Sequence, residues 1–144
     1  MATFTATFVA LAITGLVAAD QKIQMKDLPP AVQKAVQDET KGATIKGVVK
    51  EVENGTTTYE VETMVNGHSR DLVFDAKGTL VVAEEALGID AVPAPVKAAF
   101  EARGKVLKVE SVTRGKTVTY EAQVEKNGRK SEVVVGADGK LVKP

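Results

Sequence analysis

The sequence predicts an α+β protein of two tandem α-β-β-β-β repeats, with antiparallel sheets that each carry one helix packed on one face. A short amphipathic helix pattern occurs twice along the chain. After each occurrence the apolar residues change to a period of two, which is typical of strands. The strand motifs of the first copy return in the second copy in one register, which indicates an internal duplication.

The first element is an apolar N-terminal segment. Residues 1–19 contain no charged side chain, and their centre is a short apolar run that is followed by Ala18 and Ala19. Such a run is typical of a secretory signal, whereas a bilayer span needs ~20 apolar residues. We therefore predict cleavage after Ala19 and a periplasmic or secreted mature protein that no longer contacts the membrane. Because no Lys or Arg precedes the apolar run, a retained anchor or a buried helix is the alternative.

The two helix patterns begin at Leu28 and at Val92, and both place apolar residues at i, i+4, i+7 and i+8. This spacing puts the apolar side chains on one helix face. Prolines fall in the first turn, where a missing N–H costs least, and Asp27 and Asp90 precede the helices as candidate caps. The apolar sets are Leu28, Val32, Ala35 and Val36 in the first pattern and Val92, Val96, Ala99 and Phe100 in the second.

The strands that follow are set by Asn-Gly pairs, which favour the type I′ turn of a two-residue hairpin. Such turns at Asn66-Gly67 and Asn127-Gly128 place apolar residues opposite apolar residues in both copies. Asn54-Gly55 predicts a further hairpin, and a turn over residues 76–78 leads into a short fourth strand. The predicted pairs are Tyr59 with Phe74, Val61 with Leu72, Val48 with Val61, Tyr120 with Val135, and Ala122 with Val133.

These elements divide the chain into five segments. A single unit of ~55 residues would be marginally stable, so we expect the two units to share a sheet or to pack together. The patterns leave open whether the two sheets join edge to edge. The segments are a signal peptide over residues 1–19, an N-terminal tail over 20–27, a first repeat over 28–84, a linker over 85–91 and a second repeat over 92–144.

Composition narrows the function. The 19 Lys and Arg residues balance the 19 Asp and Glu residues, so no basic excess favours a nucleic-acid partner. The chain has no Cys, and its one His, His68, is expected to be exposed beside a hairpin turn. A metal site needs several converging ligands, and a nucleophilic serine needs a specific turn. We therefore predict no enzyme activity, no metal site and no cofactor.

Short motifs in both copies resemble the PepSY-like family, whose members resemble the beta-lactamase inhibitor protein fold. In the first copy they are Leu28-Pro29 with Val32, Tyr59-Glu60-Val61, and Phe74-Asp75 with Gly78. The second copy repeats them as Val92-Pro93 with Val96, and Tyr120-Glu121-Ala122, but its last turn departs from the pattern because the aspartate moves to Asp138. The resemblance implies a secreted or periplasmic non-enzymatic module, and related domains are associated with the restraint of peptidases.

The strand alternation puts both tyrosines on the helix-covered face and an acidic set with apolar spots on the opposite face. Apolar residues in an acidic surround suit either a partner-binding face or an ordinary sheet surface. We predict a binding module, with a protein partner such as a secreted or envelope peptidase and with unknown oligomeric state. The candidate partner-binding residues are Glu60, Glu62, Met64, Val73, Glu121, Gln123 and Val134.

Two other functions fit the acidic face less well. A periplasmic sensor that binds a small ligand or a cation is the alternative, because clustered carboxylates attract Ca²⁺ and cationic peptides. A hydrolase that uses the carboxylate pair Glu62 and Asp71 is the third reading. Like charges side by side raise a pKa, but the pattern assigns no carboxylate as acid and no other as nucleophile.

Overall fold

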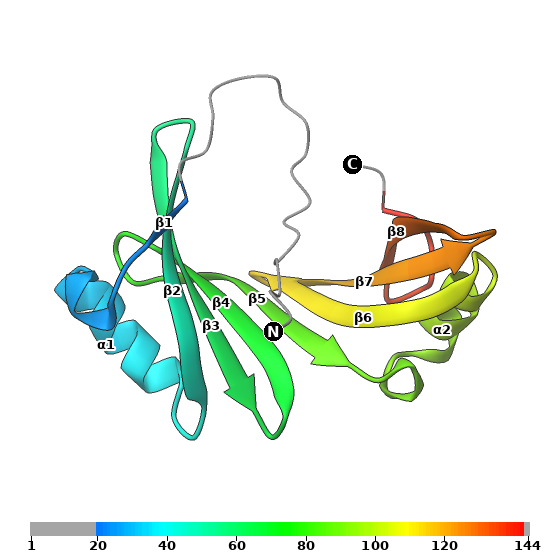
Figure 1. Cartoon of the computed structure of the whole chain (residues 1–144), viewed down its shortest axis with the longest axis horizontal. Helices are drawn as coiled ribbons and strands as arrows, with labels where there is room; N and C mark the ends of the chain where they lie inside the picture. The colour runs from blue at the N-terminus through cyan, green and yellow to red at the C-terminus, as the bar shows by residue number, and fades with distance from the viewer. Residues whose placement is uncertain (1–19, 143–144) are drawn as a thin grey trace.

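The computed structural model describes residues 20–142, which form one sheet of eight strands in chain order with two helices (Figure 1). All neighbouring strands are antiparallel. The predicted signal peptide, residues 1–19, lies outside the described residues. The strands are β1 (Gln21–Lys22), β2 (Thr44–Glu53), β3 (Thr56–Val65), β4 (His68–Asp75), β5 (Leu80–Leu87), β6 (Lys105–Arg114), β7 (Thr117–Lys126) and β8 (Arg129–Gly136). The helices are α1 (Pro30–Glu39) and α2 (Ala94–Glu101), and two 3-10 turns are η1 (Met25–Asp27) and η2 (Ile89–Ala91).

The hairpin registers are confirmed. Asn66 and Gly67 have φ angles of 50° and 84°, which is the left-handed conformation that a type I′ turn requires. All five predicted apolar pairs are present: Tyr59 with Phe74, Val61 with Leu72, Val48 with Val61, Tyr120 with Val135, and Ala122 with Val133. Side chains alternate between the two faces of a sheet, so a slip of one residue would turn every apolar side chain to the wrong face. This alternation made the register predictable.

The two predicted sheets are one continuous sheet. β5 pairs with β6 from Ala83 opposite Thr113 to Leu87 opposite Val109. The expected linker over residues 85–91 is therefore occupied by the end of β5 and by η2. Val82, Glu84 and Ala86 lie on one face of this strand, and pairing with β6 satisfies the backbone groups of the segment.

The two halves of the sheet differ in their last strand. We use "first unit" for residues 20–87 and "second unit" for residues 88–142. In the first unit the fourth strand, β5, is eight residues long, so it is longer than the short strand that the sequence predicts. In the second unit the expected fourth strand is reduced to one isolated bridge between Val135 and Leu141.

Each helix covers its own part of the sheet, so the apolar core consists of two clusters. Tyr59 lies in the first cluster and Tyr120 packs against the second, which confirms that both tyrosines face a helix. The first cluster contains Leu28, Val32, Val36, Val48, Tyr59, Val61, Leu72 and Phe74. The second contains Val92, Val96, Phe100, Val109, Ala122, Val124, Val133 and Val135.

The turn after the third long strand of each unit touches the start of the helix. A Cβ atom on Gly78, which has a φ of 84°, would lie 2.6 Å from the carbonyl oxygen of Ala31. A Cβ on Gly139 would clash in the same way with the carbonyl oxygen of Pro95. Both positions therefore require glycine, for the positive φ and for the close approach.

The sheet is strongly curved, and both helices lie on its outer side (Figure 1). The inner side carries no helix. We call this helix-free side the open face. No helix among residues 20–142 has the length and hydropathy needed to cross a membrane.

Candidate functional site

The open face carries a set of carboxyl groups that runs from β2 to β8. Strand alternation places them there, because their neighbours in sequence point to the helices. Lys108 and Arg114 lie on the same face, and the Lys108 Nζ is 2.6 Å from the Glu110 Oε1. We call the carboxyl set the acidic strip. It consists of Glu51, Glu60, Glu62, Asp71, Glu84, Glu110, Glu121 and Glu132.

Cross-strand register aligns the strip. Glu62 lies opposite Asp71, and Asp71 lies opposite Glu84, so three carboxyl groups form a row over three neighbouring strands. The row continues across the junction of the two units to Val112 and Thr119. Residues that face each other directly on antiparallel strands have Cβ atoms about 5 Å apart. The acidic groups are therefore close enough to repel one another.

Glu60 is the most enclosed member of the strip. Val49 and Val73 flank it on the two neighbouring strands, and its exposed fraction is 5%. No residue among 20–142 donates a hydrogen bond to its carboxyl group or forms an ion pair with it. Burial, followed by the negative charge of Glu51 and Asp71, raises the pKa of Glu60 to about 8. Glu60 therefore holds a proton at neutral pH.

Other members of the strip shift in the same direction. Burial and the neighbouring Glu110 raise the pKa of Glu84 to about 6. Burial also raises the pKa of Asp71, and burial together with Glu132 raises that of Glu121. The strip therefore carries less negative charge near pH 7 than its composition indicates. A cation that comes close would lower these pKa values and so increase the negative charge of the strip.

The seven predicted partner-binding residues all lie on the open face, but in two groups. The first group is on β3 and β4, where Glu60 is opposite Val73. The second is on β7 and β8, where Glu121 is opposite Val134. β5 and β6 separate the groups. Glu60 and Val73 are buried and Gln123 is exposed, while the other four are half-buried: Glu62, Met64, Glu121 and Val134.

The sequence prediction missed Glu84 as a member of the site. Glu84 lies between the two groups, opposite Asp71 on one side and Val112 on the other. It stood at the end of the predicted first repeat, and its place depends on the β5–β6 pairing. Residues 80–87 show no alternation of apolar and polar side chains, so the sequence carries no periodic signal for the full length of this strand.

A hydroxyl group on the open face also lacks a partner. The Thr119 Oγ1 is buried and makes no hydrogen bond within the described part of the chain. His68 is exposed at the start of β4, as predicted. Over residues 20–142, no three or more His, Cys, Asp or Glu side chains are arranged to hold a metal ion.

The chain belongs to the PepSY-like family. The family described as "Putative beta-lactamase-inhibitor-like, PepSY-like" matches residues 16–82 and again residues 64–143. The two matches together span most of the chain and confirm the resemblance seen in the sequence motifs. Membership of this family indicates a non-catalytic binding module. A search of curated proteins gave no match.

Solved structures from Bacteroides share the fold. A "BLIP-like protein" from Bacteroides fragilis has 23% identity and a TM-score of 0.63, and the match covers 81% of this chain and 84% of that one. A protein from Bacteroides eggerthii, described among "putative periplasmic proteins", has 22% identity and a TM-score of 0.67 with 81% and 86% covered. A DUF2874 family protein from Bacteroides ovatus has 22% identity and a TM-score of 0.65 with 81% and 85% covered.

Proposed function

We propose that this chain is an exported, non-catalytic PepSY-like protein that binds a basic surface of a partner protein through its open face. The partner is a secreted or envelope peptidase, which the chain inhibits or regulates. The observation that carries the proposal is Glu60, an almost fully enclosed carboxyl group without a partner in the middle of an acidic strip. A buried polar group without a partner is costly, so its retention favours a role in binding.

The shape and chemistry of the open face support a protein partner. The face extends over the curved sheet and combines carboxyl groups with the apolar side chains of Val49, Val73, Val82 and Val134. A mixed apolar and charged surface of this kind is typical of protein interfaces. The excess of carboxyl groups over cations selects a partner of opposite charge and speeds its association.

The proposal also covers the evolutionary origin of the chain and its location in the cell. The matching registers of the two units and the two overlapping family matches support a tandem duplication of one unit. Cleavage after Ala19 then releases the mature protein to the periplasm or the medium. The periplasmic description of the Bacteroides eggerthii protein, which shares the fold, supports this location.

Binding of a Lys or Arg side chain beside Glu60 would be coupled to proton release. A nearby positive charge favours the ionised carboxylate and lowers its pKa. Because the pKa of free Glu60 is raised to about 8, part of the binding energy is spent on deprotonation at lower pH. We expect affinity for a basic partner to rise as pH increases from 6 to 8.5 and to level off above the pKa.

The test compares which proteins the wild-type chain and its charge variants retain. The wild-type chain and a Glu62→Lys/Glu121→Lys variant are used in parallel on the native secretome, and retained proteins are identified by mass spectrometry and assayed for peptidase inhibition. The matched control, Asp38→Lys/Glu101→Lys, makes the same charge change on the two helices, where both residues form exposed ion pairs of small energetic value. We expect the control to retain the partner and the open-face variant to lose it.

Two results would contradict the proposal. One is a partner that both variants retain equally, because the open face would then not be the binding surface. The other is a rise in melting temperature on adding Ca²⁺ or a small cationic ligand, without any captured protein, because binding to the native state must stabilise it. That result would favour the sensor function.

A further inference from the structure

The two units differ at the space between the end of the helix and the sheet. In the first unit, Arg70 on β4 reaches the end of α1. Its Nη1 donates a hydrogen bond of 3.1 Å to the carbonyl oxygen of Glu39, and its Nη2 lies 3.6 Å from the Glu39 Oε2. This pair fills the space between the helix end and the third long strand.

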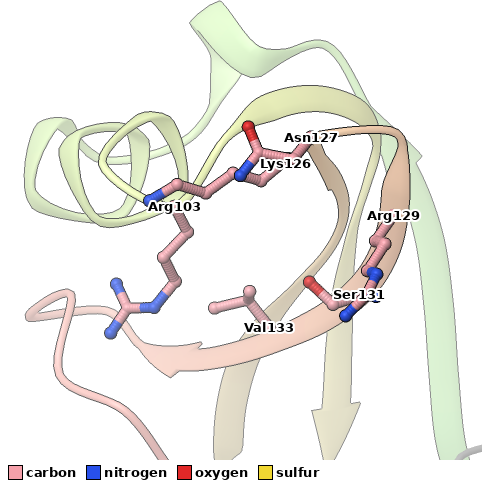
Figure 2. A pocket seen from close by; sticks show the side chains of 6 residues that line it. All are labelled: Arg103, Lys126, Asn127, Arg129, Ser131 and Val133. Atoms are coloured by element: carbon pink, nitrogen blue, oxygen red, sulfur yellow. The ribbon is translucent and has the colours of Figure 1, made fainter.

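In the second unit the same space is open. Arg103 follows the end of α2 in the place that Glu39 takes in α1, and Ser131 takes the place of Arg70 in the strand register. Arg103 and Ser131 cannot form the missing ion pair, because Ser131 carries no charge and its short side chain cannot span the gap. A cavity of about 720 Å³ results, lined by Arg103, Lys126, Asn127, Arg129, Ser131 and Val133. Ser131 and Val133 face it from β8, and Arg103 lies on its helix side (Figure 2).

The lining of this cavity is positively charged. Three of its six residues are cations and none is acidic. The Arg103 Nη1 donates a hydrogen bond of 2.8 Å to the carbonyl oxygen of Ala99, which orients the side chain. Within residues 20–142, none of the three cations forms an ion pair. The pocket therefore suits a carboxylate, which an arginine binds with charge-assisted hydrogen bonds.

The pocket adjoins a strand edge that is only partly paired. Leu141 bridges Val135, and the backbone N–H of Val142 donates to the carbonyl oxygen of Val134. In an antiparallel sheet, every second residue of an edge strand turns its backbone N–H and C=O away from the neighbouring strand. On β8 the next residues to do so after Val134 are Glu132 and Lys130. No residue among 20–142 pairs with these groups.

The first unit shows what covers the corresponding edge. There β5 pairs with β4, and Glu85 lies opposite Arg70 on the helix side of the sheet. A strand in the same position beside β8 would place one side chain opposite Ser131, at the mouth of the basic pocket. The backbone would pair with Lys130 and Glu132.

We propose that the pocket and the free edge of β8 together bind an extended acidic peptide segment, which adds as a further antiparallel strand and places one carboxylate beside Arg103. Strand addition supplies affinity through backbone hydrogen bonds, and the pocket supplies specificity. This site uses the outer edge of β8 and the basic pocket on the helix side of the sheet, whereas the proposed function uses the acidic open face.

The probe is a capped peptide with the sequence of residues 80–87, which is the strand that covers the matching edge of the first unit. Binding of this peptide to the full-length chain is measured by calorimetry and by backbone NMR. We expect saturable binding, with new hydrogen-exchange protection at Lys130 and Glu132. A peptide with Glu85→Lys should bind at least tenfold more weakly, whereas Glu84→Lys, which places a cation opposite Glu132 on the open face, should bind at least as well as the parent.

The protein variant Arg103→Glu/Ser131→Arg rebuilds the pair of the first unit and closes the pocket. We expect it to fold with an unchanged or higher melting temperature and to lose peptide binding at least tenfold. The control Lys116→Glu changes a cation in the exposed β6–β7 turn and should bind normally. Equal binding by the pocket variant, equal loss with both peptide variants, or binding without protection at Lys130 and Glu132 would overturn the proposal.

Discussion

The first and second units have the same strand register but place their largest fully buried side chain in different layers. In the first unit the helix contributes Val36 and the strand contributes Phe74. In the second unit the helix contributes Phe100 and the strand contributes Val135. All four are fully buried. The comparison shows that at this pair of positions the total side-chain volume is kept while the large and the small residue are exchanged.

The largest expected effect tests this exchange. Phe74→Val leaves a cavity, and we expect a loss of about 3 kcal/mol in the free energy of unfolding. Val36→Phe alone overfills the core and should cost about 2 kcal/mol. The double variant reproduces the arrangement of the second unit, so its cost should be well below the sum of the two. Urea unfolding curves measure all three.

Additive losses in that double-mutant cycle would contradict the exchange, because independent sites add and coupled sites do not. A useful control is Phe74→Val combined with Val96→Ala. Val96 lies in the other core cluster, so these two losses should add.

The next effect concerns the acidic strip, where Glu60 of the first unit is more enclosed than Glu121 of the second. The pKa of Glu60 is about 8 in the folded chain against an ordinary value of 4.5. Between these values the folded state binds more protons at Glu60 than the unfolded state does, so the contribution of Glu60 to stability is greatest below about pH 4.5 and is lost as pH rises through 8. We expect the protein to melt at a lower temperature at pH 8.5 than at pH 5.

Glu60→Gln should remove much of this pH dependence, because the amide cannot ionise. One pKa unit corresponds to about 1.4 kcal/mol. Relaxation of the site around the ionised carboxylate lowers the cost of its burial, so we expect a gain of roughly 2 kcal/mol at pH 8.5 and little change at pH 5. Glu121→Gln should gain less. Melting curves at both pH values are the measurement, and an equal gain from both substitutions would refute the difference between the units.

The smallest effect concerns the ion pair that closes the first unit. Arg70→Ser gives β4 the residue that β8 has, and it removes the contacts with Glu39. Partly exposed ion pairs contribute little, so we expect a loss of about 1 kcal/mol or less. Hydrogen exchange should report faster opening at the end of α1. A loss of several kcal/mol would show that the Arg70–Glu39 pair is a major support of the first unit.

Much of the fold could be predicted from local patterns. Asn66-Gly67 sets a turn type, and the turn type sets which residues face each other, so the pair of Tyr59 with Phe74 followed directly. The junction of β5 and β6 could not be predicted in this way. It joins strands separated by a helix, and the length of β5 depends on the partner strand rather than on a turn signal.

The candidate site was predictable to the same extent. The alternation of side chains along a strand was enough to place Glu60 and Glu121 on the open face. Alternation could not show that Glu84 lies between the group on β3 and β4 and the group on β7 and β8, because that depends on the β5–β6 junction. It also could not show that Glu60 is enclosed by Val49 and Val73, because burial on an uncovered face depends on the curvature of the sheet. The basic pocket has no sequence signature, since it arises from a missing contact between Arg103 and Ser131.

The β5–β6 junction also governs how the chain can be divided. A break at Gly88, which lies between β5 and η2, would leave each fragment with an exposed strand that has an exact complement on the other. Such fragments should reassociate when mixed and aggregate when kept alone, because unpaired strand edges recruit other strands. The position therefore offers a site for splitting the protein into two complementing reporters.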